Sequence, residues 1–205
     1  QCGMVIQTLN RTGIPVLPRC RGLFNISAVR DIIAWCQVIA SGSFQDSALY
    51  RIIEKKSDYK TVHSIYSRFN KIEVTPRFDA LISDPSIQDR FPILKPILES
   101  IQNFKSIIQK RSAGEMIWDI TQHLDILKPR AENYSLDDHC TLLNVGNLLK
   151  RAQDFTRRNR QNHSLNAFNI YLEAVMRSGG LPSITPASYR TQEGVIVNTV
   201  HGVKG

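Results

Sequence analysis

Residues 194–205 read Gly-Val-Ile-Val-Asn-Thr-Val-His-Gly-Val-Lys-Gly, and they decide the fold because the pattern of the chain changes there. The β-branched run up to Val200 is typical of a short buried strand. Lys204, between a glycine two residues earlier and Gly205, follows that strand at its carboxyl end, where α/β sheets present ligand-binding loops. We therefore expect α/β material at this end of the chain.

The sequence before this strand has a helical pattern almost throughout. From Ala28 to Ala40 apolar residues recur at helical spacing, and Ser27 is placed to cap that helix. Further helices are predicted at Asp46–Glu54, Thr61–Asn70, Arg77–Ile82, Phe91–Lys110, Glu115–Leu127, Leu136–Thr156 and Leu165–Arg177, the last with Ser164 as N-cap. Breaks are predicted at Asp84-Pro85 and Lys128-Pro129. Five aromatic residues fall on helical stripes and are predicted to be core: Trp35, Phe104, Trp118, Phe168 and Tyr171.

Residues 4–17 are predicted to form the second short α/β piece, at the start of the chain. Residues 4–13 predict the end of a helix closed by Gly13, and Ile14–Leu17 predicts a short strand. The fold class is therefore mainly α, a helical insertion framed by short α/β pieces. The boundaries that we expect are residues 1–40 and 190–205 for the frame and 41–189 for the insertion, with hinges near 40–43 and 187–193.

The composition and the net charge indicate which classes of partner the chain can bind. Hydrophobic residues make up 42% of the 205 residues and charged residues 21%, which indicates a folded globular chain. Lys and Arg number 26 against 18 Asp and Glu, a net charge of +8, which favours an anionic partner such as nucleic acid or an acidic membrane surface. No apolar run reaches the roughly 18 residues of a membrane span, so we expect a soluble cytoplasmic protein and no membrane partner.

The four cysteines predict no metal site. Cys2, Cys20, Cys36 and Cys140 are far apart, and no pair has zinc-finger or redox-motif spacing. We expect reduced, mostly buried thiols. The chain begins at Gln1 within a patterned segment, so we also expect a longer parent protein.

Four segments together resemble the UvrD/Rep-type DNA helicases of superfamily 1. The second motor domain of that family carries a G-I-P-[YV] segment followed by G, F and E-[IV]-R-D, and returns after a helical insertion with motif V, T-x-H-x-x-K-G-L-E-F. The corresponding residues here are Gly13-Ile-Pro-Val16, Gly22-Leu-Phe24, Val29-Arg-Asp31 and Thr199-Val-His-Gly-Val-Lys-Gly205.

The resemblance implies what the parent protein does. It would be an ATP-dependent helicase that uses ATP and Mg²⁺, moves 3′ to 5′ on single-stranded DNA, and carries residues 41–189 as its accessory 2B subdomain. Motif V residues Thr199, His201, Lys204 and Gly205 would contact single-stranded DNA and couple it to the nucleotide cleft. Regulatory proteins often bind this subdomain, so they are expected partners.

The chain also departs from the family pattern. Walker A and Walker B are absent, so we expect no bound ATP, no catalytic residue and no ATPase activity from the chain itself. Motif V stops before Leu-Glu-Phe. The Gly-Ile-Gly loop of many relatives is replaced by Lys55-Lys-Ser-Asp-Tyr-Lys60.

A basic cluster ends the longest predicted helix, and it consists of Lys150, Arg151, Arg157, Arg158 and Arg160. It is either a patch that holds duplex phosphates or a solvated helix end that interacts favourably with the helix dipole. Readout of base sequence is not expected, because a helicase moves along any sequence.

Two other functions fit the sequence. One is a helicase-nuclease of the RecB/AddA kind, which a nuclease domain after residue 205 would reveal. The other is a nonenzymatic all-α module that binds nucleic acid or protein, which explains the charge but not the T-x-H-x-x-K-G ending. The pathway, whether repair, replication restart or recombination, is left open, as is the oligomeric state.

Overall fold

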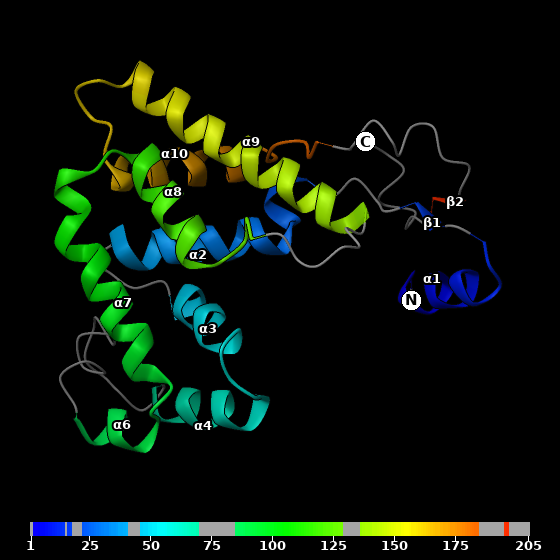
Figure 1. The fold of residues 1–205 in the computed structure, drawn as a ribbon, viewed down its shortest axis with the longest axis horizontal. Helices are drawn as coiled ribbons and strands as arrows, with labels where there is room; N and C mark the ends of the chain where they lie inside the picture. The colour runs from blue at the N-terminus through cyan, green and yellow to red at the C-terminus, as the bar shows by residue number, and fades with distance from the viewer. Residues whose placement is uncertain are drawn as a thin grey trace.

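The computed structural model is mainly helical, which confirms the predicted mainly α class (Figure 1). It describes residues 2–14, 16–17, 22–40, 46–69, 85–128, 136–184 and 195–196. In chain order the elements are α1 (Cys2–Arg11), β1 (Val16–Leu17), η1 (Leu23–Asn25), α2 (Ser27–Ala40), α3 (Asp46–Glu54), α4 (Tyr59–Phe69), α6 (Pro85–Arg90), α7 (Leu94–Ile107), η2 (Ile108–Lys110), α8 (Ala113–His123), α9 (Leu136–Arg158), α10 (Leu165–Arg177) and β2 (Val195–Ile196).

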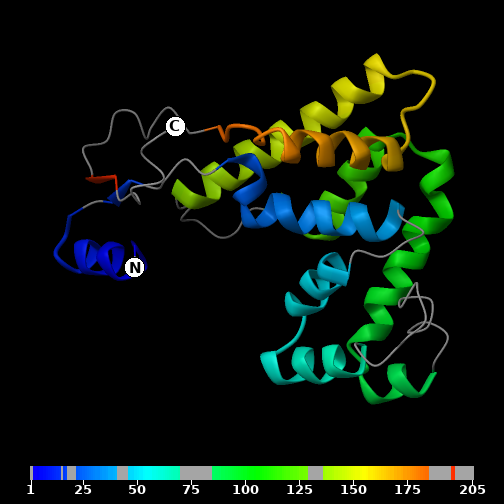
Figure 2. The same ribbon diagram turned by 180° about the vertical axis from the view of Figure 1, so that it is seen from behind.

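Helix α2 is the centre of the helical body. It contacts α3, α7, α8, α9 and α10, and it lies between the upper layer of α8–α10 and the lower helices α3 and α4 (Figures 1 and 2). Its buried residues are Val29, Ile32, Ile33, Ala34, Trp35, Cys36, Val38 and Ile39. A helix that is apolar on nearly every side is buried on nearly every side. The contacts of α2 therefore cross the predicted boundary at residue 40.

Several predicted helix limits are confirmed. Helices α3 and α10 have the predicted bounds, and the Ser164 Oγ accepts a hydrogen bond from the Ala167 N–H at 3.2 Å as the N-cap of α10. The predicted core positions of Trp35 and Phe168 are confirmed by exposures of 3% and 0%. The helix predicted at Arg77–Ile82 lies outside the described residues.

Other helix limits are corrected by local hydrogen bonding. Helix α4 begins at Tyr59 rather than Thr61, because the Asp58 carboxylate accepts from the backbone N–H groups of Lys60 and Thr61 at 2.9 and 3.1 Å. Pro85 is not only a break but the first residue of α6, a position where its missing N–H costs nothing. Helix α8 ends at His123 rather than Leu127, and Asp125 follows in the left-handed region with φ of 53°.

The prediction that Ser27 caps a helix starting near Ala28 is wrong. Ser27 is the first residue of α2. Its Oγ instead accepts hydrogen bonds from the side chains of Arg51 and Lys55, each at 3.2 Å. A tertiary contact has replaced the expected local one.

The two ends of the helical body lie side by side. At its start the Leu23 N–H donates to the carbonyl of Leu181, 2.8 Å away, which follows the last helix. Farther out, β1 pairs with β2 in parallel, with Val16 opposite Val195 and Leu17 opposite Ile196. The pair lies with α1 at one end of the molecule, away from the helical body (Figures 1 and 2). The chain therefore leaves a small parallel strand pair, forms the helices and returns to it.

Candidate nucleic-acid interface

The predicted basic cluster lies at the carboxyl-terminal end of α9 and just beyond it. Lys150, Arg157, Arg158 and Arg160 are exposed, and Arg151 is half-buried. Within the described ranges, the side chains of these residues make no ion pair. Lys150 and Arg157 are seven residues apart, about two helical turns, so they point to the same side of α9. The positive charge of this end is therefore presented to solvent without an ion pair to the described residues, and Asp154 is the acid that lies among these cations on α9.

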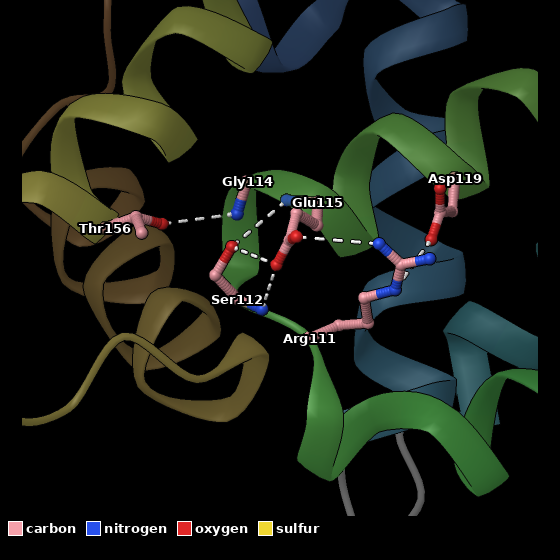
Figure 3. Close-up of polar contacts among 6 residues, drawn as sticks. All are labelled: Arg111, Ser112, Gly114, Glu115, Asp119 and Thr156. Carbon is pink, nitrogen blue, oxygen red and sulfur yellow. Dashed lines mark hydrogen bonds and ion pairs between the residues drawn. The ribbon is translucent and has the colours of Figure 1, made fainter.

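Helix α8 crosses this end of α9 at close range. The Gly114 N–H donates to Thr156 Oγ1 at 3.3 Å (Figure 3). A Cβ on Gly114 would stand 3.4 Å from the Cα of Gln153. Ala113 and Ala152 are both fully buried. Small residues on both helices allow their backbones to approach, so α8 and α9 form one continuous surface.

The amino terminus of α8 is closed to external anions. A capping box joins Ser112 and Glu115: the Glu115 N–H donates to Ser112 Oγ at 3.4 Å, and the Ser112 N–H donates to the Glu115 carboxylate at 2.8 Å (Figure 3). The Ala113 N–H donates to the carbonyl of His163 at 2.8 Å. Hydrogen bonds from Ser112, first from its N–H and then from its hydroxyl, lower the pKa of Glu115, and Arg111 adds to this. Any anion at this surface must therefore be held by side chains.

Arg111 is occupied by two carboxylates of α8. Its guanidinium lies 3.5 Å from Glu115 Oε1 and 3.8 Å from Asp119 Oδ2, and Figure 3 shows it between the two. The side chains are 29–52% exposed, so the pairs are weak in energy, but they largely cancel the charge of Arg111.

A hollow of about 300 Å³ lies along the α8–α9 crossing. Its lining includes Arg111, Glu115, Trp118, Gln153 and Arg157. Arg157 is thus one of the predicted phosphate contacts and also part of this hollow. Sequence reasoning missed the hollow, because it depends on the angle at which two helices cross.

The prediction that Trp118 belongs to the core is wrong, because its side chain is 49% exposed. The buried stripe of α8 runs through Ala113, Met116, Ile117 and Ile120. Trp118 is one residue beyond that stripe, about 100° around the helix. The position of Trp118 one residue beyond the buried stripe could have been read from the sequence, and it indicates an exposed side chain.

A second, larger pocket of about 400 Å³ lies between α2, α3 and the turn after α8. Asp31 of α2 lines it and pairs with Arg51 at 2.6 Å and Lys55 at 3.4 Å. Both basic side chains also reach Ser27. Asp31 therefore joins α2 to α3, and its ion pairs account for Arg51 and Lys55 among the cations that line this pocket.

The motif V residues Thr199, His201, Lys204 and Gly205 lie outside the described residues, as do nearly all residues of the expected hinges. Among the residues that the structure does describe, there is no group of His, Cys, Asp and Glu that could hold a metal ion. In the same part of the chain, no helix is long and apolar enough to cross a membrane.

Comparison of the chain with protein-family profiles, with curated proteins and with solved structures finds no match.

Proposed function

We propose that this chain is the helical accessory part of a UvrD/Rep-type DNA helicase, with the adjoining strips of its second motor domain. The parent protein would use ATP and Mg²⁺ to move 3′ to 5′ along single-stranded DNA. The helical body would be its regulatory, duplex-facing arm, and regulatory proteins would be further partners. We expect the parent to act in the cytoplasm.

The parallel pairing of β1 with β2 is the observation that carries this proposal. Parallel strands need a crossover connection, usually a single helix. Here the connection runs from Leu17 to Val195 and contains the whole helical body. An insertion between two adjacent strands of a motor sheet has this connectivity. The T-x-H-x-x-K-G segment begins at Thr199, three residues after β2 ends at Ile196, as motif V follows a strand in the family.

The contacts where the chain enters and leaves the helical body, at residues 22–24 and 180–181, support the same connectivity. Leu23 and Leu181 are hydrogen-bonded, and Gly180, with φ of +80°, would place a Cβ 3.5 Å from the ring of Phe24. Entry and exit therefore meet at residues 22–24 and 180–181. Since α2 packs among the other helices, we propose that the helical part begins near residue 22 rather than at residue 41.

The basic end of α9 would serve as the contact with duplex phosphates. Its exposed cations have no acidic partners among the described residues, and contacts to phosphate are independent of sequence. A motor that must pass every sequence requires this kind of contact.

The coding sequence on either side of these residues tests the proposal. We expect G-x-x-x-x-G-K-[ST] upstream of residue 1 and Leu-Glu-Phe directly after Gly205. The complete protein should then show ATPase activity that single-stranded DNA stimulates, and Walker A lysine→Ala should abolish it. An unrelated continuation after Gly205 without Walker A would refute the proposal, whereas a nuclease domain farther downstream would refine it to a helicase-nuclease.

A further inference from the structure

The hollow between α8 and α9 combines an exposed indole with one uncompensated cation. Trp118 lines this hollow and is 49% exposed, although tryptophan is highly buried on average. Arg157, on the facing helix, makes no ion pair with the described residues. The two side chains come from different helices, which are joined by the Gly114–Thr156 hydrogen bond and pack through the buried residues Ala113 and Ala152.

The charges around the hollow differ from one wall to the other. On the α8 wall, the two carboxylates of Glu115 and Asp119 surround the single cation Arg111, which leaves one net negative charge. On the α9 wall, Arg157 is positive, and Lys150 continues the same face about two turns away. A phosphate is therefore attracted to α9 and repelled from α8, while an uncharged aromatic ring can lie against Trp118.

We propose that this hollow binds one unpaired nucleobase, which stacks on Trp118 while Arg157 holds an adjacent phosphate. The ligand class is single-stranded nucleic acid, or the unpaired end of a duplex. Every base has an aromatic face, so stacking tolerates any sequence. This inference rests on the proposed function and deepens it, because it adds a contact to unpaired bases beside the phosphate contacts of α9.

The hollow suits a base better than an acidic peptide. Carboxylates of such a peptide would meet Glu115 and Asp119 on one wall, whereas a base carries no charge of its own. The net charge of +8 also favours a polyanion whose charges lie outside the hollow, along the basic face of α9.

The test compares two probes that differ only in their bases. Fluorescence anisotropy measures binding of the 205-residue chain to a thymidine oligonucleotide of about 12 nucleotides and to an abasic oligonucleotide of the same length. The wild type should prefer the thymidine strand by about 5- to 150-fold, the range expected for one stacked base. Trp118→Ala should bind both strands equally, and Trp118→Phe should keep part of the preference.

Tyr59→Ala is the matched control, because Tyr59 is 77% exposed but lies on α4, on the other side of α2 (Figure 1). It should keep the wild-type preference. Circular dichroism and thermal unfolding of each variant show that it is folded.

The intrinsic fluorescence of tryptophan gives a second readout. The chain has two tryptophans, and Trp35 is 3% exposed, packed against Phe104 and His123. The thymidine strand should quench the wild type through Trp118, and Trp118→Phe should lose this quenching. Equal binding of both probes by the wild type, or an unchanged preference in Trp118→Ala, would overturn the proposal. If binding still depended on salt after either result, the proposed phosphate contacts of α9 would stand without the base-stacking site. The helicase proposal is tested separately, by the coding sequence on either side of these residues.

Discussion

Asn144 and Ile184 exchange two hydrogen bonds that fix the exit of the chain from the helical body. The Asn144 side-chain Nδ2 donates to the Ile184 carbonyl at 2.8 Å, and its Oδ1 accepts from the Ile184 N–H at 2.7 Å. Asn144 is fully buried on α9 and also donates to the carbonyl of Cys140 at 2.7 Å. The Asn144 side-chain amide thus satisfies both the N–H and the carbonyl of Ile184, as the backbone of a neighbouring strand would.

Asn144→Ala should destabilise the protein by about 1–3 kcal/mol, because it leaves the Ile184 N–H and carbonyl without their partner. Urea unfolding measures the loss, and the amide of Ile184 should exchange with solvent faster in the variant. Asn166→Ala, an exposed position on α10, is the control and should stay within about 0.5 kcal/mol of the wild type. Unchanged exchange at Ile184 would contradict the role assigned to Asn144.

Asp31→Ala should cost about 1–3 kcal/mol, because Asp31 joins α2 to Arg51 and Lys55 and is only 18% exposed. A double-mutant cycle with Arg51→Met isolates the pair and should give a coupling energy above about 0.5 kcal/mol. Asp89→Ala, at an exposed position on α6, serves as the control. Strictly additive effects of Asp31→Ala and Arg51→Met would mean that the ion pair contributes nothing.

Stability should fall as pH is lowered from about 7 to 5, in part because of His123. Burial beside Trp35 and Phe104 lowers the pKa of His123 below its usual value near 6.5, Lys56 lowers it further, and Asp125 opposes the shift. Below pH 6.5 the unfolded chain therefore takes up this proton more readily than the folded chain, so protonation favours unfolding. Urea unfolding at several pH values should show a shallower decline for His123→Phe, and equal slopes for both proteins would contradict the prediction.

Arg157→Ala/Arg158→Ala should weaken the binding of duplex or forked DNA and reduce its dependence on salt. For every phosphate that the variant no longer neutralises, the slope of log K against log salt should become shallower by about 0.9, and the two arginines can neutralise two phosphates at most. Thermal stability should hardly change, because both side chains are exposed. Anisotropy titrations at several salt concentrations measure the slope.

The control for this variant is Lys95→Ala/Lys110→Ala, which removes the same charge from exposed positions on α7 and η2. It should leave the slope close to that of the wild type. If both double variants reduced the slope equally, net charge rather than the basic end of α9 would explain the binding. If neither did, the arginines would be only a solvated helix end.

The sequence alone determined where most of the helices lie. The apolar spacing of 3.6 residues located α2, α3 and α10, and Ser164 marked the start of α10, because these signals act within one or two turns of chain. The position of the basic cluster at the end of α9 could also be predicted from the sequence, and Lys150, Arg157, Arg158 and Arg160 are exposed there while Arg151 is half-buried.

Only the tertiary structure decided which residues meet. Ser27 has the residue type of a cap, but Arg51 and Lys55 reach it from another helix. The spacing along α8 places Trp118 off the buried stripe, but only the packing of α8 against α9 puts it in the same hollow as Arg157. Local sequence sets hydrogen bonds within a turn, whereas contacts such as those of Leu23 with Leu181 and Asn144 with Ile184 depend on how whole helices pack, and that depends on every residue of the core.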